Sequence, residues 1–147
     1  MLGHTYEGQD CSLARALEIV GERWTLLIIR SALLGTKRFD AFLENLEIAR
    51  NVLTKRLTRL VEHGLMERVP YQDRPVRHEY RLTASGRDLT RTVIALTQWG
   101  DRNLPQELDP PRRADHIGCD GTVHIELRCS GCGRAVHDEE VVVRRIR

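Results

Sequence analysis

Apolar residues recur every three to four positions through the first 63 residues, which predicts a series of amphipathic helices. Helices are expected at residues 11–20, 24–34, 39–46 and 50–63. The second segment, WTLLIIRSALL, is apolar on nearly every side, so it is expected to be buried at the centre of the fold. Gly21, Gly35 and Gly64 follow three of these segments, and glycine is well suited to ending a helix.

Beyond Gly64 the pattern changes to two short strands and a longer helix. Residues 65–69 and 78–82 predict strands, and the polar segment 70–77, which contains two prolines, predicts the tip of a hairpin between them. Thr83 to Ser85 can cap a further helix that runs from about Gly86 to Leu104.

Three prolines, Pro105, Pro110 and Pro111, interrupt the regular pattern and predict a linker. Residues 1–105 are therefore expected to form one domain, 106–111 a linker, and 112–147 a small appendage of short β segments.

The composition is typical of a soluble globular protein, because 41% of the 147 residues are hydrophobic and 30% are charged. This length excludes a large two-domain enzyme. No apolar run approaches the roughly 20 residues that a membrane span requires. The first nine residues lack the basic start and apolar stretch of a secretory signal. We therefore expect a cytoplasmic protein with no membrane partner.

Positive charge is concentrated in one part of the chain. Residues 50–81 carry eight basic and four acidic side chains, whereas the net charge of the whole chain is only +2. A basic segment in a nearly neutral protein indicates an anionic partner. Charge counting alone also allows an ordinary solvated surface.

The helix expected at residues 50–63 has two distinct faces. Its inward stripe is apolar and comprises Leu53, Leu57, Leu60 and Val61. Its outward stripe comprises Asn51, Thr54, Lys55 and Thr58, and no acidic residue occurs before Glu62. Such short polar and cationic side chains can enter a major groove and bond base edges or phosphates. A surface helix beside a solvated loop is the alternative.

The order helix, turn, helix and hairpin predicts an α+β fold of the winged helix-turn-helix type that binds double-stranded DNA. The candidate DNA contacts are Arg50, Asn51, Thr54, Lys55, Thr58 and Arg59 in the helix, and Arg74 and Arg77 in the hairpin that follows.

Four stretches between Cys11 and roughly Leu104 carry a family likeness: CSLARALEIVGERWTLLIIRSALLG, RFDAFLENL, NVLTKRLTRLVEHGLMER and RHEYRLTASG. In this order they resemble the HxlR-type winged-helix transcriptional regulators. The resemblance implies a homodimer on a pseudo-palindromic operator, with Asn51 to His63 as the recognition helix and Met66 to Leu82 as the wing. It also implies that the first and last helices form the dimer interface.

Two residues, Ser12 and Ala49, depart from the family pattern. Ser12 replaces a frequent proline and is expected to matter little. Ala49 stands where a serine often caps the recognition helix, so we expect the loss of about 1 kcal/mol unless another group supplies the cap.

The apolar pattern of the last predicted helix also indicates a dimer, independently of the resemblance. Leu89, Val93 and Leu96 form one apolar stripe, and Ile94, Ala95 and Trp99 lie beside it. By periodicity alone, Trp99 can pack on its own domain or on a second copy. The resemblance favours the homodimer, whose two recognition helices would lie about 34–36 Å apart, one turn of DNA.

Cys11 lies at the start of the first predicted helix. A helix N-terminus favours the reactive thiolate form, so Cys11 is a candidate redox switch. The resemblance points the same way, because several regulators of this type sense oxidants with a cysteine at the matching position. The alternative is a small residue packed at the dimer interface, since residues 12–118 contain no second cysteine to resolve it.

Histidine and cysteine residues of the appendage have a spacing that is typical of metal ligands. His116 and Cys119 are separated by two residues, as are Cys129 and Cys132. Two such half-sites supply four ligands for tetrahedral zinc, and 36 residues are too few for a stable core without a metal or a docking partner. We therefore expect a zinc-ribbon-like appendage with one structural zinc.

Alternatives remain for this segment. His124 or His137 can replace His116 as the fourth ligand, and the three cysteines are the firmer prediction. The appendage can also be a hairpin with reduced thiols that docks on the first domain. Val123, Ile125 and Leu127 alternate with polar residues and predict a strand that leads into the second cysteine pair.

A DNA-binding transcriptional regulator is the leading interpretation. The sequence shows no phosphate-binding glycine-rich loop, nucleophile elbow or paired carboxylates, and four protein ligands would leave zinc no open position, so no enzyme activity is expected. One alternative is a protein-interaction module that acts through its appendage. Another is a zinc or redox sensor whose DNA binding depends on the appendage. No pocket for a small-molecule effector can be read from the pattern.

Overall fold

The computed structural model describes residues 5–105 and 107–146. Two compact units divide the chain, the first ending at Val93 and the second beginning at Ile94. The predicted linker at residues 106–111 falls within the second unit, and its residue 106 lies outside the described residues.

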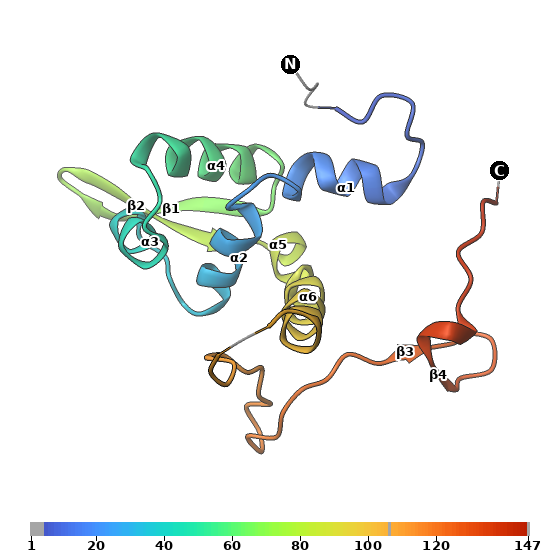
Figure 1. Cartoon of the computed structure of the whole chain (residues 1–147). Coiled ribbons are helices and arrows are strands. Elements are labelled where there is room, and N and C mark those ends of the chain that lie inside the picture. Colours follow the sequence, from blue (N-terminus) through green and yellow to red (C-terminus); the bar gives the residue numbers. More distant parts are fainter. Residues whose placement is uncertain (1–4, 106, 147) are drawn as a thin grey trace. The chain divides into compact units, whose positions relative to one another are not determined.

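The elements of the first unit follow one another as the sequence predicts, except that the helix predicted after the hairpin is two helices (Figure 1). Its helices are α1 (Ser12–Val20), α2 (Thr25–Leu33), α3 (Phe39–Leu46), α4 (Arg50–Glu62) and α5 (Ala84–Asp88), with α6 (Thr90–Asn103) beginning at its end. Its strands are β1 (Met66–Asp73) and β2 (Val76–Leu82), which pair antiparallel. The α+β class is therefore confirmed.

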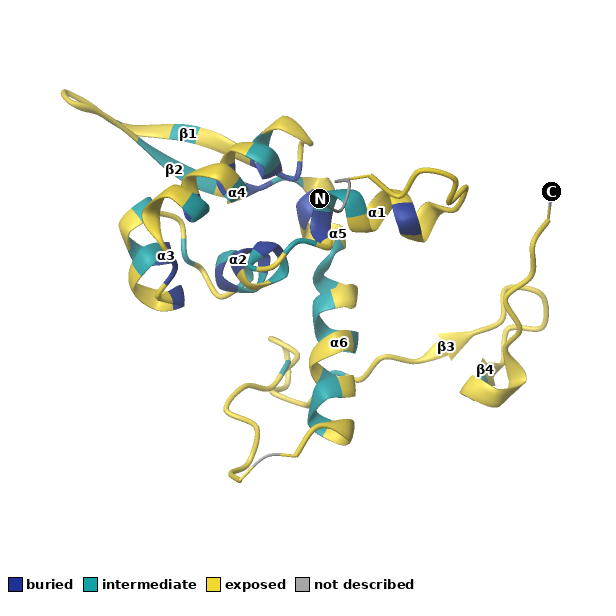
Figure 2. Cartoon of the chain, turned by 45° about the horizontal axis from the view of Figure 1, so that its top comes forward, coloured by how far each residue is buried: buried dark blue, intermediate teal, exposed yellow. Residues whose placement is uncertain are grey.

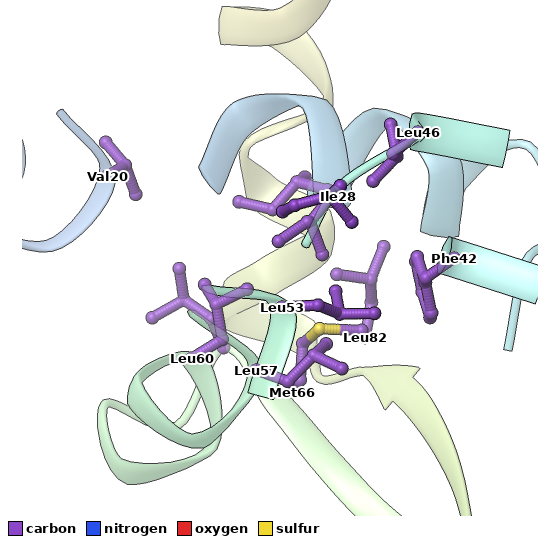
Figure 3. Close-up of a cluster of buried hydrophobic side chains, with 12 residues drawn as sticks. Val20, Ile28, Phe42, Leu46, Leu53, Leu57, Leu60, Met66 and Leu82 are labelled. Atoms are coloured by element: carbon purple, nitrogen blue, oxygen red, sulfur yellow. The ribbon is translucent and has the colours of Figure 1, made fainter. Parts of the chain in front are cut away.

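The core of the first unit lies between α2, α3, α4 and the base of the hairpin (Figure 3). Its largest fully buried side chains are Ile28, Ile29, Phe42, Leu53, Leu57, Leu60 and Met66. The helix α2 contributes both isoleucines, which confirms the central position that its apolar sequence predicts. Burying these branched and aromatic side chains fixes the orientation of α3 and α4 around α2.

The hairpin is longer than the sequence predicts. The strands extend to Asp73 and begin again at Val76, so the predicted eight-residue tip is wrong. Pro70 lacks an N–H for the ladder, and the register shifts between Pro70 and Gln72. Such a bulge lets the strand continue past the proline, which is why the proline does not mark its end.

Three hydrogen bonds attach the hairpin to the helices. The Tyr80 N–H donates to the Lys37 carbonyl at 2.7 Å, which ties β2 to the segment before α3. At its base, the Thr83 N–H donates to the Leu65 carbonyl at 3.0 Å and the Thr83 hydroxyl donates to the Gly64 carbonyl at 2.6 Å. The predicted cap at Thr83 is also confirmed, because its Oγ1 accepts the Gly86 N–H at 3.2 Å.

The helix predicted from Gly86 to Leu104 is instead two helices, α5 and α6, with a turn at Leu89. The Leu89 N–H bonds the Gly86 carbonyl three residues back, at 3.2 Å. The Thr90 hydroxyl donates to the Arg87 carbonyl at 2.6 Å. These local hydrogen bonds compete with the regular i to i−4 bonds of an α-helix. Hydrophobic periodicity does not reveal such competition, so the sequence predicts one continuous helix.

The second unit contains the rest of α6, two short strands, β3 (Leu127–Arg128) and β4 (Ala135–Val136), and the 3₁₀ helix η1 (Asp138–Glu140). The strand predicted over residues 123–127 is present only at its end. The Gln98 side chain bonds the Val123 carbonyl at 2.7 Å and the Ile125 N–H at 3.5 Å, so these backbone groups are not available to a second strand. Among the described residues, no helix has the length and apolar character to cross a bilayer.

We predict that Gly86→Ala destabilises the first unit. A Cβ at residue 86 would lie 2.1 Å from the Leu65 carbonyl oxygen, so the backbone has to shift. We expect a loss of about 1–3 kcal/mol in the free energy of unfolding, measured by urea denaturation. The matched control is Gly100→Ala in α6, whose Cβ would meet only Leu104 Cδ1 at 3.9 Å. This control is expected to gain up to about 1 kcal/mol, and a Gly86→Ala variant as stable as the wild type would contradict the close packing.

Candidate nucleic-acid interface

The helix α4 keeps its two stripes apart in the folded chain (Figure 2). Leu53, Leu57 and Leu60 are at most 1% exposed, so they fix the rotation of the helix about its axis. The predicted outward residues Asn51, Thr54, Lys55 and Thr58 are all exposed. The structure therefore brings four of the candidate DNA contacts onto one solvent-facing surface, which we call the polar stripe of α4.

The start of α4 lacks a side-chain cap, as the sequence predicts. Ala49 is the N-cap residue and supplies no hydrogen bond from its side chain. The Arg50 side chain lies 3.6 Å from a carboxylate oxygen of Asp40 and 5.1 Å from the Phe39 ring centroid. It is 70% exposed, so this contact with α3 leaves the guanidinium accessible beside the polar stripe.

Two arginines of α4 turn away from the polar stripe. The Arg59 Nη2 donates to the Glu18 carbonyl at 2.9 Å, which attaches α4 to α1. Arg56 donates to the Arg23 carbonyl at 3.3 Å and forms an ion pair with Glu22. Arg59, a candidate DNA contact by sequence, is therefore placed as a structural link between helices.

The hairpin presents its predicted arginines to solvent. Arg74 lies in the turn and Arg77 near the start of β2, and both are exposed. Between the hairpin and α3 is a hollow of about 600 Å³, lined in part by Arg38, Arg68 and Arg77.

The sequence prediction missed two arginines in this hollow, Arg38 and Arg68. The Arg38 guanidinium lies 4.3 Å from the Tyr71 ring centroid, and the Arg68 Nη2 lies 3.2 Å from His78 Nδ1. Arg68 pairs across the hairpin with Tyr80, so strand alternation could have placed it on the face that carries Tyr80. No sequence signal points to Arg38, because it precedes α3 and meets the hairpin only in the fold.

Glu79 on β2 holds the arginines around it. Its Oε2 accepts from Arg81 Nη2 at 2.9 Å, and its Oε1 lies 3.9 Å from Arg38 Nε. The hydrogen bond from Arg81 outweighs the effect of desolvation and lowers the pKa of the Glu79 carboxyl, with additional attraction from Arg81, Lys37 and Arg38. The carboxylate therefore stays ionised at neutral pH and orients Arg81 and Arg38, of which Arg38 lines the hollow.

Cys11 is the N-cap residue of α1, so its predicted place at the first turn is confirmed. Its Sγ accepts the Ala14 N–H at 3.3 Å, and the residue is exposed. The sulfur is thus accessible and lies at the N-terminal end of a helix, as the redox hypothesis requires.

The candidate metal ligands are brought together as two separate pairs. His116 Nδ1 lies 3.3 Å from Cys119 Sγ, and Cys129 is hydrogen-bonded with Cys132. The N–H groups of Cys132 and Gly131, together with the Cys132 side chain, lower the pKa of the Cys129 thiol. Among the described residues, no three side chains of His, Cys, Asp or Glu form a cluster that could hold a metal ion.

The family model that matches this chain is the HxlR-like helix-turn-helix, over residues 19–108. The chain belongs to this family. An HTH-type transcriptional regulator of Mycobacterium tuberculosis (strain H37Rv) is 48% identical over 145 residues, 99% of this chain and 87% of the relative. The YdeP regulator of Bacillus subtilis is 29% identical over 78% of this chain and 94% of the relative. This HxlR-like protein is therefore a transcriptional regulator of the winged-helix type.

Solved structures agree with this assignment. PA1607, described as a candidate transcription factor, has a TM-score of 0.82 and 34% identity over 94% of this chain and 96% of its own. The redox regulator HypR in its reduced form has a TM-score of 0.59 and 30% identity, over 63% of this chain and 93% of its own. The reduced form of YodB from B. subtilis has a TM-score of 0.56 and 30% identity, over 65% of this chain and 96% of its own.

We predict that Glu79→Gln destabilises this HxlR-like regulator at pH 7 and that the difference disappears in acid. The pKa of Glu79 is lower in the folded chain than in the unfolded chain, so its stabilising effect is present above the unfolded pKa and is lost as pH falls through the folded pKa. Urea unfolding gives the free energy of unfolding of the variant and of the wild type at pH 7 and at pH 3. Glu67→Gln, at an exposed carboxylate of β1, is the matched control, and an equal loss at both pH values would contradict the ion-pair role of Glu79.

Proposed function

We propose that this regulator binds double-stranded DNA as a homodimer, with the polar stripe of α4 in the major groove and the hairpin on the adjacent backbone. One observation carries the proposal: the buried leucines of α4 force its polar stripe toward solvent, and no acidic residue interrupts that stripe. Amide, hydroxyl and ammonium groups there match the hydrogen-bonding groups of base edges.

The charge around the stripe supports this geometry. Arg74 and Arg77 are exposed on the hairpin, where arginine can bond phosphate oxygens. The first N–H groups of α4 receive no bond from the side chain of Ala49, so they are suited to a phosphate at the helix N-terminus. Arg50 lies at the same end of the helix.

Exposed apolar side chains support a second copy of the chain as partner. On α1, Leu13 is 68% and Leu17 is 37% exposed. On α6, Leu96 is 52% and Trp99 is 50% exposed, whereas Leu89 and Val93 of the predicted stripe pack against the core. Covering these side chains in a two-fold dimer removes apolar surface from water and presents two copies of α4 to DNA.

We predict that Asn51→Ala or Lys55→Ala weakens binding to the DNA upstream of the regulator's own gene. Loss of a base contact costs about 1–3 kcal/mol, which is about 5- to 150-fold in affinity. Arg74→Ala is expected to weaken all sequences similarly and to reduce the salt dependence by about one counterion. Fluorescence anisotropy with specific and scrambled duplexes measures both effects.

Arg87→Ala is the matched control, since Arg87 is exposed on α5, at the opposite end of the strands from the hairpin tip (Figure 1). Its affinity is expected to equal that of the wild type. Unchanged affinity of both α4 variants at physiological salt would contradict the major-groove assignment. Sedimentation of the saturated complex tests the dimer, because we expect two chains per duplex.

We further propose that oxidation of Cys11 controls DNA binding. This proposal is supported by the exposed Cys11 sulfur and by the similarity to HypR and YodB, whose structures are described in reduced, oxidised or diamide-treated forms. In the reaction, Cys11 and a second thiol form a disulfide and pass two electrons and two protons to an oxidant such as diamide, whose N=N bond becomes an NH–NH bond. The second thiol comes from a small molecule or from the other copy of the chain.

We predict that diamide lowers the DNA affinity of the wild type at least about tenfold and leaves Cys11→Ser unchanged, because serine cannot form the disulfide. The same anisotropy assay measures the response before and after treatment. Cys129→Ser is the comparison variant and is expected to remain sensitive; if it is insensitive while Cys11→Ser is too, Cys129 of the other copy is the second thiol. If Cys11→Ser responds as the wild type does, the switch does not lie at Cys11.

A further inference from the structure

Two segments of the second unit share one backbone pattern, although their sequences show no obvious repeat. We call residues 115–122 the first knuckle and residues 128–135 the second knuckle. Asp115 pairs antiparallel with Thr122, and Arg128 pairs in the same way with Ala135. Each pairing closes a turn of the same length.

The hydrogen bonds inside the two knuckles also correspond. The His116 N–H donates to the Gly121 carbonyl at 2.8 Å, and the Cys129 N–H donates to the Arg134 carbonyl at 3.0 Å. At the tips, the Asp120 N–H donates to the His116 carbonyl at 2.8 Å, and the Gly133 N–H donates to the Cys129 carbonyl at 2.9 Å. The two turns therefore have the same construction, shifted by 13 residues along the chain.

The tip of each knuckle turns through a residue with positive φ, which is +59° at Asp120 and +72° at Gly133. Each also has a glycine directly before its second candidate ligand, Gly118 and Gly131. A Cβ at Gly118 would lie 2.8 Å from His116 Cε1, so the absence of a side chain there leaves room for the imidazole.

Each knuckle directs two potential metal donors toward one another. In the first, His116 Nδ1 and Cys119 Sγ are 3.3 Å apart. In the second, a Cβ at Gly131 would lie 3.7 Å from Cys129 Sγ, so this sulfur lies beside the short segment that leads to Cys132. Each knuckle is thus built as half of a four-ligand site.

This part of the chain has no core to hold it together. No residue between 107 and 146 is buried, and only Ala114, Val123 and Val136 are partly covered (Figure 2). The strands of the second knuckle have two residues each. So small a structure needs a source of stability other than apolar burial.

We propose that the two knuckles bind one zinc ion through His116, Cys119, Cys129 and Cys132. Three thiolates and one imidazole suit tetrahedral zinc and do not suit magnesium or calcium. Since the two pairs form no common cluster among the described residues, binding closes the knuckles on one another about the segment between them. The thiols release their protons to solvent as they bind. Four protein ligands leave no position for a reactive water, so the role of the metal is structural.

The structure favours His116 over the other two histidines that the sequence allows. The His137 side chain accepts the backbone N–H of Glu140, while Glu140 Oε2 accepts the His137 N–H at 2.8 Å, so His137 closes its own turn at η1. His124 lies between the knuckles rather than within either. His116 is the histidine that shares a knuckle with a cysteine at contact distance.

The test uses the full chain, purified anaerobically, with zinc measured by mass spectrometry and the site probed by Co²⁺. We expect about one zinc per chain and, with cobalt, the strong thiolate charge-transfer and ligand-field absorption of a tetrahedral site. Cys119→Ser, Cys129→Ser and Cys132→Ser are each expected to lose most of the zinc. His116→Ala is expected to weaken cobalt binding at least about tenfold, and Cys11→Ser is the matched control that keeps the metal.

Three results would overturn the proposal. The first is protein with reduced cysteines that holds no zinc and shows no cobalt–thiolate absorption. The second is full zinc content in Cys119→Ser, which would show that the knuckles do not share an ion. The third is a Cys129–Cys132 disulfide in the anaerobic protein, seen by intact mass after alkylation. None of these measurements involves DNA, so a failure of the zinc proposal can be distinguished from a failure of the proposed DNA binding.

Discussion

The burial of three leucines on one side of α4 is the constraint on which the candidate DNA surface depends. Leu53, Leu57 and Leu60 are almost completely removed from water and pack with the side chains of α2 and α3. A helix held along its length by such a stripe cannot rotate about its axis without exposing apolar surface. The opposite stripe is therefore fixed toward solvent, and within it the Thr54 hydroxyl donates to the Arg50 carbonyl at 2.9 Å.

Arginines serve different roles within this one framework. Arg56 and Arg59 bond backbone carbonyls of residues before α2, so they join α4 to the rest of the first unit. Arg38 and Arg81 are oriented by Glu79 on β2. Arg74 and Arg77 extend into solvent at the hairpin. The basic character of residues 50–81 is therefore divided between stability and the exposed surface, and charge counting cannot separate the two.

The two compact units are stabilised in different ways. The first unit buries a continuous cluster of aliphatic and aromatic side chains. Residues 107–146 of the second unit bury none and rely on local turns whose hydrogen bonds repeat between the two knuckles. A shared zinc ion would supply there the cross-link that apolar packing supplies in the first unit.

The sequence by itself determined the order of the helices, the hairpin, the two faces of α4 and the spacing of the cysteines, because these follow from local periodicity and turn residues. Tertiary structure decided the rest. The Arg59 side chain finds its partner at Glu18, 41 residues away, and Arg38 meets Tyr71 beside the hairpin only in the folded chain. The break at Leu89 and the extension of the strands past Pro70 likewise depended on hydrogen bonds that compete with periodicity. A long polar side chain takes its partner from whatever the fold places within reach, and that information is not contained in its neighbours along the chain.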